Sequence, residues 1–476
     1  MTTPLHAQYD SIDALAQAIA DKRVSAADLA QSAMQAIQAQ ASTNIFVHVD
    51  TDLTTQQALE LDEQAAKGQA GSLAGAPVAH NDRIVTQGWP TTAASAMLAG
   101  YVSPFDATAV RQANQAGAIT FGKVNCDEFG MGAADETSAH GALHLADPSS
   151  PAQHRAAGGA AAAVSSGLVM AALDTPADHD AYPGAASHGV TRLHGTRGLV
   201  SRYGLVANAS TLDQICPVAR HARDVLALAD AISGFDPADG TSLQQWDGQA
   251  NNPGHLRTAF NAAQEQQDTT SHSPLAGLRV GTPDAQLHHA DPQATQALED
   301  TLSHLESLGA QRVAVSPTHL DHALATYRVL AAAEASSNLS RYDGVHFGHR
   351  ATQYQDLSDM IARSRQEGFG DEAKRRILLG TYFLSEAHYD GWYVQAQRMR
   401  RLIANALAHT LHTDCDLMLA PDTTFDALTA GSMLAGLPAV SFAAAGASPV
   451  SLKLIGRHFA DAHLLAVTDR YQQTTA

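Results

Sequence analysis

Clustered aspartates and histidines are the first residues of this chain whose types could carry chemistry. Asp174, Asp178, His179, Asp180 and His188 lie in one short stretch and offer the oxygen and nitrogen atoms that divalent cations bind. Their spacing matches no established pattern of metal ligands, and the 24 histidines of the chain are scattered along it. Because clustered Asp and His in such a loop are usually just exposed, the sequence predicts no metal site, and it indicates no cofactor.

Three cysteines are further residues that could ligate a metal or form a disulfide bond. Cys126, Cys216 and Cys415 are odd in number and far apart in the sequence. This spacing predicts neither a disulfide framework nor a zinc cluster. We expect three buried, unreactive thiols.

The charge balance limits the partners of the chain. Acidic residues outnumber basic ones by 48 to 29, and the net charge of −19 repels a phosphate backbone. We therefore expect no direct contact with nucleic acid, which another chain would have to hold. The sequence has no run of 18 or more apolar residues and its N-terminus is polar, so we expect a cytoplasmic protein without a membrane span.

The elements that must position these residues follow an α/β pattern. Short apolar runs at 76–79 and 118–121 are bounded by Gly and Pro, and an amphipathic stretch at 108–116 separates them, which predicts βαβ units. Residues 158–173 are nearly all small or apolar, which favours a buried helix. Further strands are expected at 278–281, 312–315, 417–420, 439–442 and 450–454, with a long helical region at 372–412 and a final helix from His463.

Two segments bear on domain organisation. Residues 1–40 read as a helical hairpin, with an apolar stripe at 11–20 and a capping box at 25–28 that opens the second helix. Residues 236–273 are rich in Gln, Asp, Asn, Ser and Gly, which predicts an exposed internal connection. With 45% hydrophobic residues, the chain of 476 residues can bury one large core or two moderate ones, and we expect a single domain over 1–476.

Six sequence blocks carry a resemblance to a known family. They are Gly75-Ala-Pro-Val-Ala-His, Asn125-Cys-Asp-Glu-Phe-Gly-Met-Gly, Ser201-Arg-Tyr-Gly-Leu-Val, Ser210-Thr-Leu-Asp-Gln, Glu334-Ala-Ser-Ser-Asn-Leu-Ser-Arg-Tyr-Asp-Gly and Lys374-Arg-Arg-Ile-Leu-Leu-Gly-Thr. In this order, they resemble the amidase signature enzymes, and among these the A subunits of glutamine-dependent tRNA amidotransferases. The resemblance implies the amidase signature fold, a large central mixed sheet covered by helices on both faces. It also implies a role in translation, in which glutamine hydrolysis feeds ammonia to a B subunit that amidates misacylated tRNA, while a small C subunit wraps the pair.

The residues that hydrolyse the amide in that family are replaced here. The family lysine, which acts as the base, corresponds to Asn81, whose amide nitrogen has no available lone pair. The serine that relays the proton corresponds to Ala156, and the nucleophilic serine corresponds to Asp180. No insertion or deletion is needed from Gly158 to Gly204 to make this match. Since losing a nucleophile or its base alone can cost on the order of 10⁶ in turnover, the resemblance predicts an inactive site.

Neighbouring residues offer no evident substitute. Ser165, Ser166 and Ser187 do not follow a Gly-Gly turn that would expose a nucleophile. In the turn that would supply the oxyanion donors, Pro176 removes a backbone N–H, and Asp178 adds a negative charge that repels a developing oxyanion.

Residues that would hold glutamine remain, according to the same resemblance. They are Tyr327, Arg376 and Asp426. Arg376 would pair with the substrate carboxylate and Asp426 with its α-ammonium group. The structural alternative is that Arg376 belongs to a solvated basic helix face and that Tyr327 packs in the core.

Three hypotheses follow. The chain is a non-hydrolysing scaffold or regulatory subunit that keeps the fold and the partner surface. Alternatively, it is an active glutaminase subunit or other amide hydrolase that uses unrecognised residues. The third hypothesis is a non-catalytic module that binds glutamine.

Overall fold

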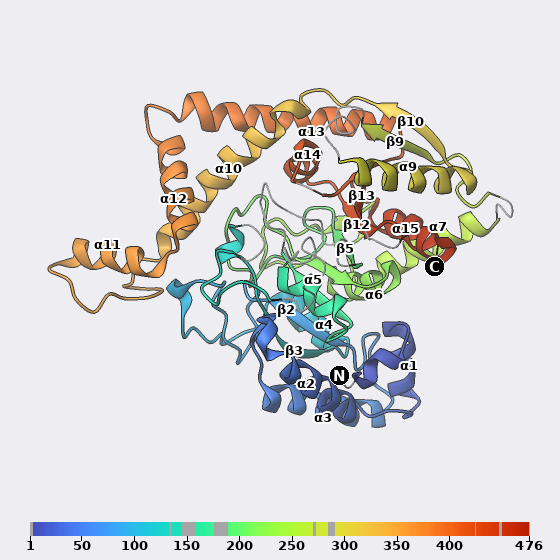
Figure 1. Ribbon diagram of the computed structural model, residues 1–476, viewed down its shortest axis with the longest axis horizontal. Coiled ribbons are helices and arrows are strands. Elements are labelled where there is room, and N and C mark those ends of the chain that lie inside the picture. The colour runs from blue at the N-terminus through green and yellow to red at the C-terminus, as the bar shows by residue number, and fades with distance from the viewer. Residues whose placement is uncertain are drawn as a thin grey trace.

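One mixed sheet dominates the molecule (Figure 1). The computed structural model describes residues 3–132, 136–144, 158–175, 189–269, 273–283, 291–423, 425–446 and 450–475. Within these ranges the sheet has eleven strands in the order β1-β3-β2-β4-β6-β5-β12-β13-β11-β9-β10. Their bounds are β1 Phe46–His48, β2 Pro77–Asn81, β3 Ile119–Val124, β4 Ala171–Asp174, β5 Thr191–His194, β6 Cys216–Ala219, β9 Arg279–Pro283, β10 Gln311–Val315, β11 Leu417–Pro421, β12 Ala439–Ala443 and β13 Ser451–Gly456.

Helices follow most of these strands. Their bounds are α1 Ile12–Ala20, α2 Ala26–Ala39, α3 Thr51–Ala66, α4 Thr108–Gln115, α5 Gly158–Ser165, α6 Ala222–Ile232, α7 His255–Thr269, α9 Pro292–Ser307, α10 Ala323–Asn338, α11 Leu357–Gly368, α12 Asp371–Leu384, α13 Gln395–Thr413, α14 Ala427–Ala435 and α15 Asp461–Thr475. A π-helical segment, η8 at Asp390–Val394, leads into α13. The α/β architecture expected from the sequence is therefore confirmed.

The strands β2, β3 and β4 form the parallel part of the sheet that positions the candidate site. β2 pairs in parallel with β3 through the α4 crossover, as expected for a βαβ unit, and with β4 on its other side. Because parallel strands end at the same edge of a sheet, the residues that follow β2 and β4 meet there.

Both faces of the sheet are buried. Successive strand residues point to opposite faces and pack into different hydrophobic clusters. On β2, Val78 packs into the cluster that includes α4 and α6, while Ala79 packs into the one that includes α2, α3 and α5. On β11, Leu419 packs with α9 and α15, and Met418 packs with α10, α13 and α14. Helices therefore cover both faces at each end of the sheet.

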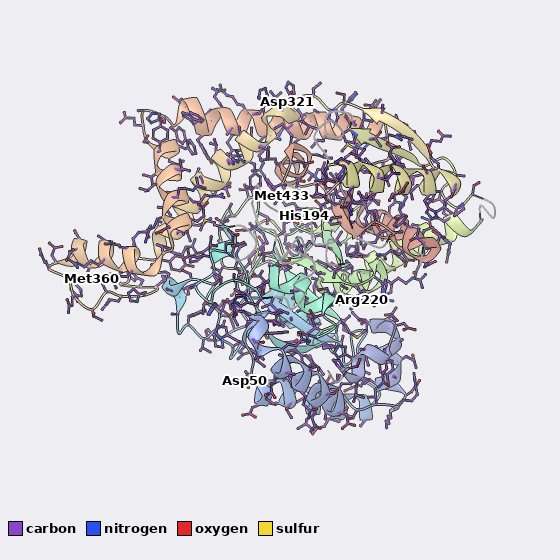
Figure 2. All side chains as sticks on the ribbon, viewed as in Figure 1. Asp50, His194, Arg220, Asp321, Met360 and Met433 are labelled. Carbon is purple, nitrogen blue, oxygen red and sulfur yellow. The ribbon has the colours of Figure 1, made fainter. Side chains whose placement is uncertain are left out.

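A group of long helices extends away from this core. In Figure 1, α11 and α12 lie at the left and α13 runs along the top. Figure 2 shows Met360, on α11, at the outer end of this projection, and His194, on β5, near the middle of the molecule.

The apolar segment 158–173 is not the single buried helix that its composition predicts. α5 ends at Ser165, and residues from Ala171 onward form β4. Gly167 lies between them with φ +68°, the left-handed conformation that commonly ends helices. Small apolar residues suit a buried helix and a buried strand alike, so periodicity could not separate the two.

Residues 236–273 are not the exposed connection that their composition predicts. They contain the two-stranded ribbon β7 (Gln245–Trp246) and β8 (Gln249–Ala250), and the helix α7. Leu256 and Phe260 are buried, and α7 packs on α6 and α15. Asp239 is also buried and pairs with Arg202 at 2.9 Å. One helical turn of apolar spacing is enough to anchor an otherwise polar helix.

Two other expectations can be compared with the structure. All three cysteines are free and buried, and burial raises the pKa of the Cys216 thiol to about 12 and that of Cys415 to about 11. Among the helices within the described ranges, none combines the length and the apolarity needed to cross a bilayer.

Candidate functional site

Asn81, which the sequence resemblance aligns with the family lysine, is held by hydrogen bonds at both ends of its amide group. Asn81 ends β2 and is buried beside Asp174, which ends β4. The Asn81 Nδ2 donates to Asp174 Oδ1 at 3.0 Å, and the Asn81 Oδ1 accepts the backbone N–H of Arg83 at 3.0 Å. An amide used in this way holds two strand ends together but has no basic lone pair for proton abstraction.

Asp174 is also half of a buried ion pair. Its Oδ2 lies 2.5 Å from the Nη2 of Arg192 on β5, and both side chains are less than 10% exposed. β6 lies between β4 and β5, where Asp174 faces Cys216 and Arg192 faces Val218. Positions two apart on a strand share one face, which brings the carboxylate and the guanidinium together.

Arg83 forms a second buried ion pair at this edge. Its Nη2 donates to Asp213 Oδ1 at 2.7 Å and to the Val206 carbonyl at 3.0 Å. Its Nη1 donates to the hydroxyl of Thr175 at 3.2 Å, immediately after β4. Two buried arginines therefore pair with two buried aspartates around the strand ends.

The sequence reasoning missed a buried lysine on β3. The Nζ of Lys123 donates to the Ile84 carbonyl at 2.5 Å and to the Thr91 hydroxyl at 3.1 Å, and it lies 3.7 Å from Asp82 Oδ1. Burial lowers the pKa of Lys123 to about 8, although the Asp82 carboxylate opposes the shift. The available signal was a charged residue inside an otherwise apolar strand.

Lys123 lies on the opposite face of the sheet from Asn81. Its Cα partner on β2 is His80, whose pKa is lowered to about 3 by burial and by the Lys123 charge. Neighbouring strand residues point to opposite faces, so His80 and Lys123 share the face that Asn81 does not use.

Ala156 and Asp180, which the resemblance aligns with the two family serines, lie outside the described residues, as do Pro176, Asp178, His179, Ser187 and His188. Of the serines weighed as substitutes, Ser165 ends α5, and its hydroxyl donates to the Ala162 carbonyl one turn earlier. Asp174, considered as a metal ligand, instead bonds Asn81 and Arg192.

Two of the predicted glutamine contacts lie next to each other. Tyr327 is buried on α10, and its ring packs edge-on against Phe425 at 4.8 Å, directly before Asp426. Asp426 is the N-cap of α14 and accepts from the backbone and hydroxyl of Thr429, both at 2.7 Å. Its Oδ1 also lies 3.1 Å from the Nζ of Lys453. The carboxylate is thus already used by a helix end and a buried lysine.

The third predicted contact, Arg376, lies on α12. Its Nε donates to Glu372 Oε1 at 2.7 Å, one turn earlier, and its side chain is 13% exposed. Arg375 shares the same carboxylate at 2.5 Å. α12 packs along α10, which carries Tyr327. The assignment of Tyr327, Arg376 and Asp426 to glutamine stays a prediction.

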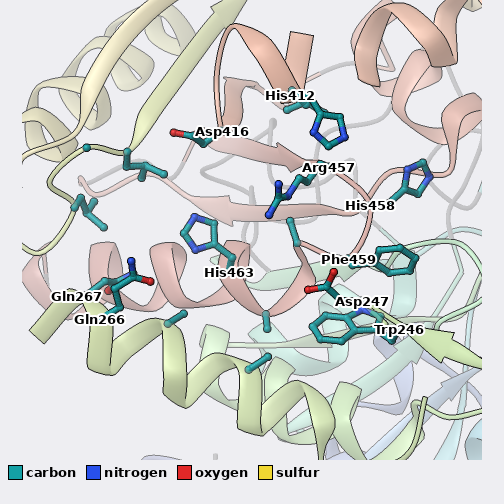
Figure 3. A pocket seen from close by; sticks show the side chains of 18 of the residues that line it. Trp246, Asp247, Gln266, Gln267, His412, Asp416, Arg457, His458, Phe459 and His463 are labelled. Carbon is teal, nitrogen blue, oxygen red and sulfur yellow. The ribbon is translucent and has the colours of Figure 1, made fainter. Parts of the chain in front are cut away.

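A pocket of about 600 Å³ lies elsewhere, and Figure 3 shows the side chains that line it. Its lining combines Trp246, Asp416, Arg457 and His463 with residues of α7 and with His412 on α13. Burial lowers the pKa of His463, so this imidazole is neutral at physiological pH. The pocket contains none of the residues assigned above to hydrolysis or to glutamine binding.

The comparisons with known proteins agree with the fold and the sequence blocks. A family model described as Amidase matches residues 28–435. The A subunit of the glutamyl-tRNA(Gln) amidotransferase of Bordetella petrii is 48% identical over 500 residues, covering 100% of this chain and 97% of that protein. The chain is therefore homologous to proteins with this name.

Solved structures give the same result. The A subunit of the glutamyl-tRNA(Gln) amidotransferase of Thermotoga maritima matches with a TM-score of 0.69 and 31% identity, covering 95% of this chain and 92% of that one. The peptide amidase of Stenotrophomonas maltophilia matches with a TM-score of 0.77 and 25% identity, covering 99% and 98%. The amidase signature fold expected from the sequence is confirmed.

Proposed function

The chain belongs to the amidase family, and we propose that it is a non-hydrolysing relative of the amidotransferase A subunit that acts as a scaffold or regulatory subunit. The observation that carries this proposal is the buried network at the lysine position. Asn81 is held by Asp174, and Asp174 is held by Arg192. A base would need a lone pair at this point, and the amide has none.

The two positions outside the described residues support the same proposal through their chemistry. Alanine at 156 has no hydroxyl to relay a proton. Aspartate at 180 would attack as a carboxylate, but hydrolysis then lacks an acid that protonates the leaving amine. The loss of all three groups leaves no obvious route to turnover.

Partnership with B and C subunits is the second part of the proposal. The helices that extend from the core expose large apolar side chains, among them Leu378 at 71% and Tyr382 and Trp392 at nearly half. Exposed apolar groups gathered on a few elements are typical of surfaces that bind other proteins. The relatives are named as subunits, and a subunit role fits this surface. We propose that this role is carried out in the cytoplasm.

Glutaminase activity tests the proposal directly. The purified chain, alone and mixed with its cognate B and C subunits, is assayed for ammonia release from glutamine, and glutamine binding is followed by calorimetry in the same samples. The positive control is a homologous A subunit whose sequence carries the lysine and both serines. We expect complex formation without ammonia release.

The other outcomes separate the remaining hypotheses. Ammonia release at the control rate would overturn the proposal and require a different nucleophile. Glutamine binding without release would favour the binding module, in which Tyr327, Arg376 and Asp426 clamp the amino acid.

A further inference from the structure

Three potential metal ligands meet beside β3 although they are far apart in the sequence. His48 ends β1, Asp82 directly follows β2, and His140 lies in the segment 136–144. β1 and β2 flank β3, which brings His48 and Asp82 to the same end of the sheet. One ligand atom from each residue lies within 4.8 Å of the other two, and the two imidazole rings meet edge-on at 5.4 Å.

Two buried polar atoms of this cluster have no hydrogen-bond partner. They are Asp82 Oδ1 and His48 Nε2. Asp82 is fully buried, and its nearest opposite charge is the Nζ of Lys123 at 3.7 Å, beyond hydrogen-bond distance. An unsatisfied buried polar atom costs about 1–3 kcal/mol, so both atoms are available to a bound cation.

The remaining atoms of the cluster are held firmly by the loop around Thr92. Asp82 Oδ2 accepts the backbone N–H groups of Thr92 at 3.0 Å and Ala94 at 3.1 Å, together with the Thr92 hydroxyl. The same hydroxyl lies 2.9 Å from His140 Nε2. Its single proton goes to Asp82, so His140 Nε2 donates to it, which leaves the other ring nitrogen with its lone pair. Such contacts fix the carboxylate and the ring in the way that outer partners fix metal ligands.

We propose that His48, Asp82 and His140 bind one zinc ion. Two imidazoles and one carboxylate are a ligand set that zinc uses, and the exposed side of His140 leaves a fourth position for water. This site goes beyond the scaffold role and does not depend on it.

One charged group faces the cluster. The Nζ of Lys123 lies 3.7 Å from Asp82 Oδ1 and donates to the Ile84 carbonyl and the Thr91 hydroxyl. The Asp82 carboxylate would therefore be shared between this ammonium group and a bound ion.

Metal binding to the full chain tests the site. The protein is stripped with a chelator, Zn²⁺ affinity is measured by competition with a chromophoric chelator, and Co²⁺ is added separately for its visible absorption. We expect one tight site per chain and the intense bands of four-coordinate Co²⁺. His140→Ala should weaken Zn²⁺ binding by more than about 100-fold and abolish these bands, and Thr92→Val should weaken it by about 10-fold.

The matched control is His346→Ala, because His346 is also exposed and lies outside the cluster. Removing an exposed side chain such as His140 leaves the core intact, so unfolding curves of the stripped proteins should coincide. Equal Zn²⁺ affinity in the wild type, His140→Ala and His346→Ala would mean adventitious binding to the many histidines and would overturn the proposal. Failure to bind Zn²⁺ at all would overturn it as well.

Discussion

Two polar regions of this molecule use charge differently. At the ends of β2 and β4, Arg192 and Asp174 are both buried and directly paired. On α12, Arg376 and Glu372 pair across one helical turn, with side chains 13% and 22% exposed. The first pair crosses three strands of the sheet, and the second stays within one helix.

The two pairs differ in how much hydration their charges lose when the chain folds. A buried charge has lost its water, so removing its partner leaves it uncompensated, whereas a partly exposed charge regains water. The strand-end network therefore has a structural function that tolerates little change. The α12 pair contributes little to stability and can be exchanged for contacts with a ligand or a partner.

Breaking the buried pair should have the largest effect. Arg192→Leu leaves the Asp174 carboxylate buried without its cation, and we expect a loss of about 3–5 kcal/mol in the free energy of unfolding. Urea denaturation measures this loss. The double variant Arg192→Leu/Asp174→Leu should recover much of it, and Arg312→Ala, which removes an exposed pair with Glu299, should cost less than about 1 kcal/mol. A loss below 1 kcal/mol in Arg192→Leu would contradict the comparison.

A buried carboxylate on α6 sharpens the comparison through its pH dependence. Burial raises the pKa of Asp224 to about 6 from an ordinary value of 3.8, and the backbone N–H of Ile12, which donates to it at 2.8 Å, only partly offsets this. The folded state holds the proton more tightly, so this contribution to stability is complete below pH 4 and is lost as the pH rises through 6. At pH 8, Asp224→Asn should raise the free energy of unfolding by about 2–3 kcal/mol.

A second carboxylate on the same helix provides the control. Asp230, also on α6, accepts the backbone N–H groups of Gly254 and Arg257 near the Arg257 guanidinium. Asp230→Asn should therefore give no gain at pH 8. The prediction for Asp224→Asn fails if denaturation at pH 4 and at pH 8 shows the same difference from the wild type.

The N-cap of α14 should give an intermediate effect. Asp426→Ala removes the acceptor for the Thr429 N–H and one of two carboxylates near Lys453, while Asp422 remains at 3.5 Å. We expect a loss of about 1–2 kcal/mol in thermal or urea unfolding. Asp426→Ser keeps a capping oxygen and should recover part of this loss. Equal losses in both variants would argue against a capping role.

The smallest effect is expected on α12. Arg376→Ala should change the free energy of unfolding by less than about 0.5 kcal/mol, because Arg375 still pairs with Glu372. Arg375→Ala is the matched control on the same carboxylate. If calorimetry detects glutamine binding that only Arg376→Ala removes, the α12 pair is a ligand site. If both variants bind glutamine as the wild type does, Arg376 is not part of a glutamine site.

Much of the fold could be predicted from local patterns. The βαβ unit of β2, α4 and β3 follows from apolar runs on either side of an amphipathic helix. The helix α9 can be predicted from Leu298, Leu302 and Leu305, whose spacing places them on one helical face. The prediction of one buried helix at 158–173 was wrong because small residues suit a buried helix and a buried strand alike. The prediction of an exposed connection at 236–273 was wrong because Leu256 and Phe260, one helical turn apart, anchor α7 despite the polar composition of the segment.

The site was harder to predict than the fold. Asn81 could be located because it lies in a contiguous block, but its bonds to Asp174 and, through it, to Arg192 depend on strand order. The cluster of His48, Asp82 and His140 joins three separate segments, and neither the histidine count nor any spacing indicated it. Local sequence predicts elements, whereas contacts between them require the topology.

The packing of α15 on α6 and α7 has a consequence for biosynthesis. Leu464 and Leu465 belong to the same hydrophobic cluster as Val225 and Leu226, yet they leave the ribosome long after these residues. Until then α6 presents an uncovered apolar stripe to solvent or to a chaperone. Folding of this chain is therefore largely post-translational, and a deletion of α15 should aggregate rather than yield a smaller domain.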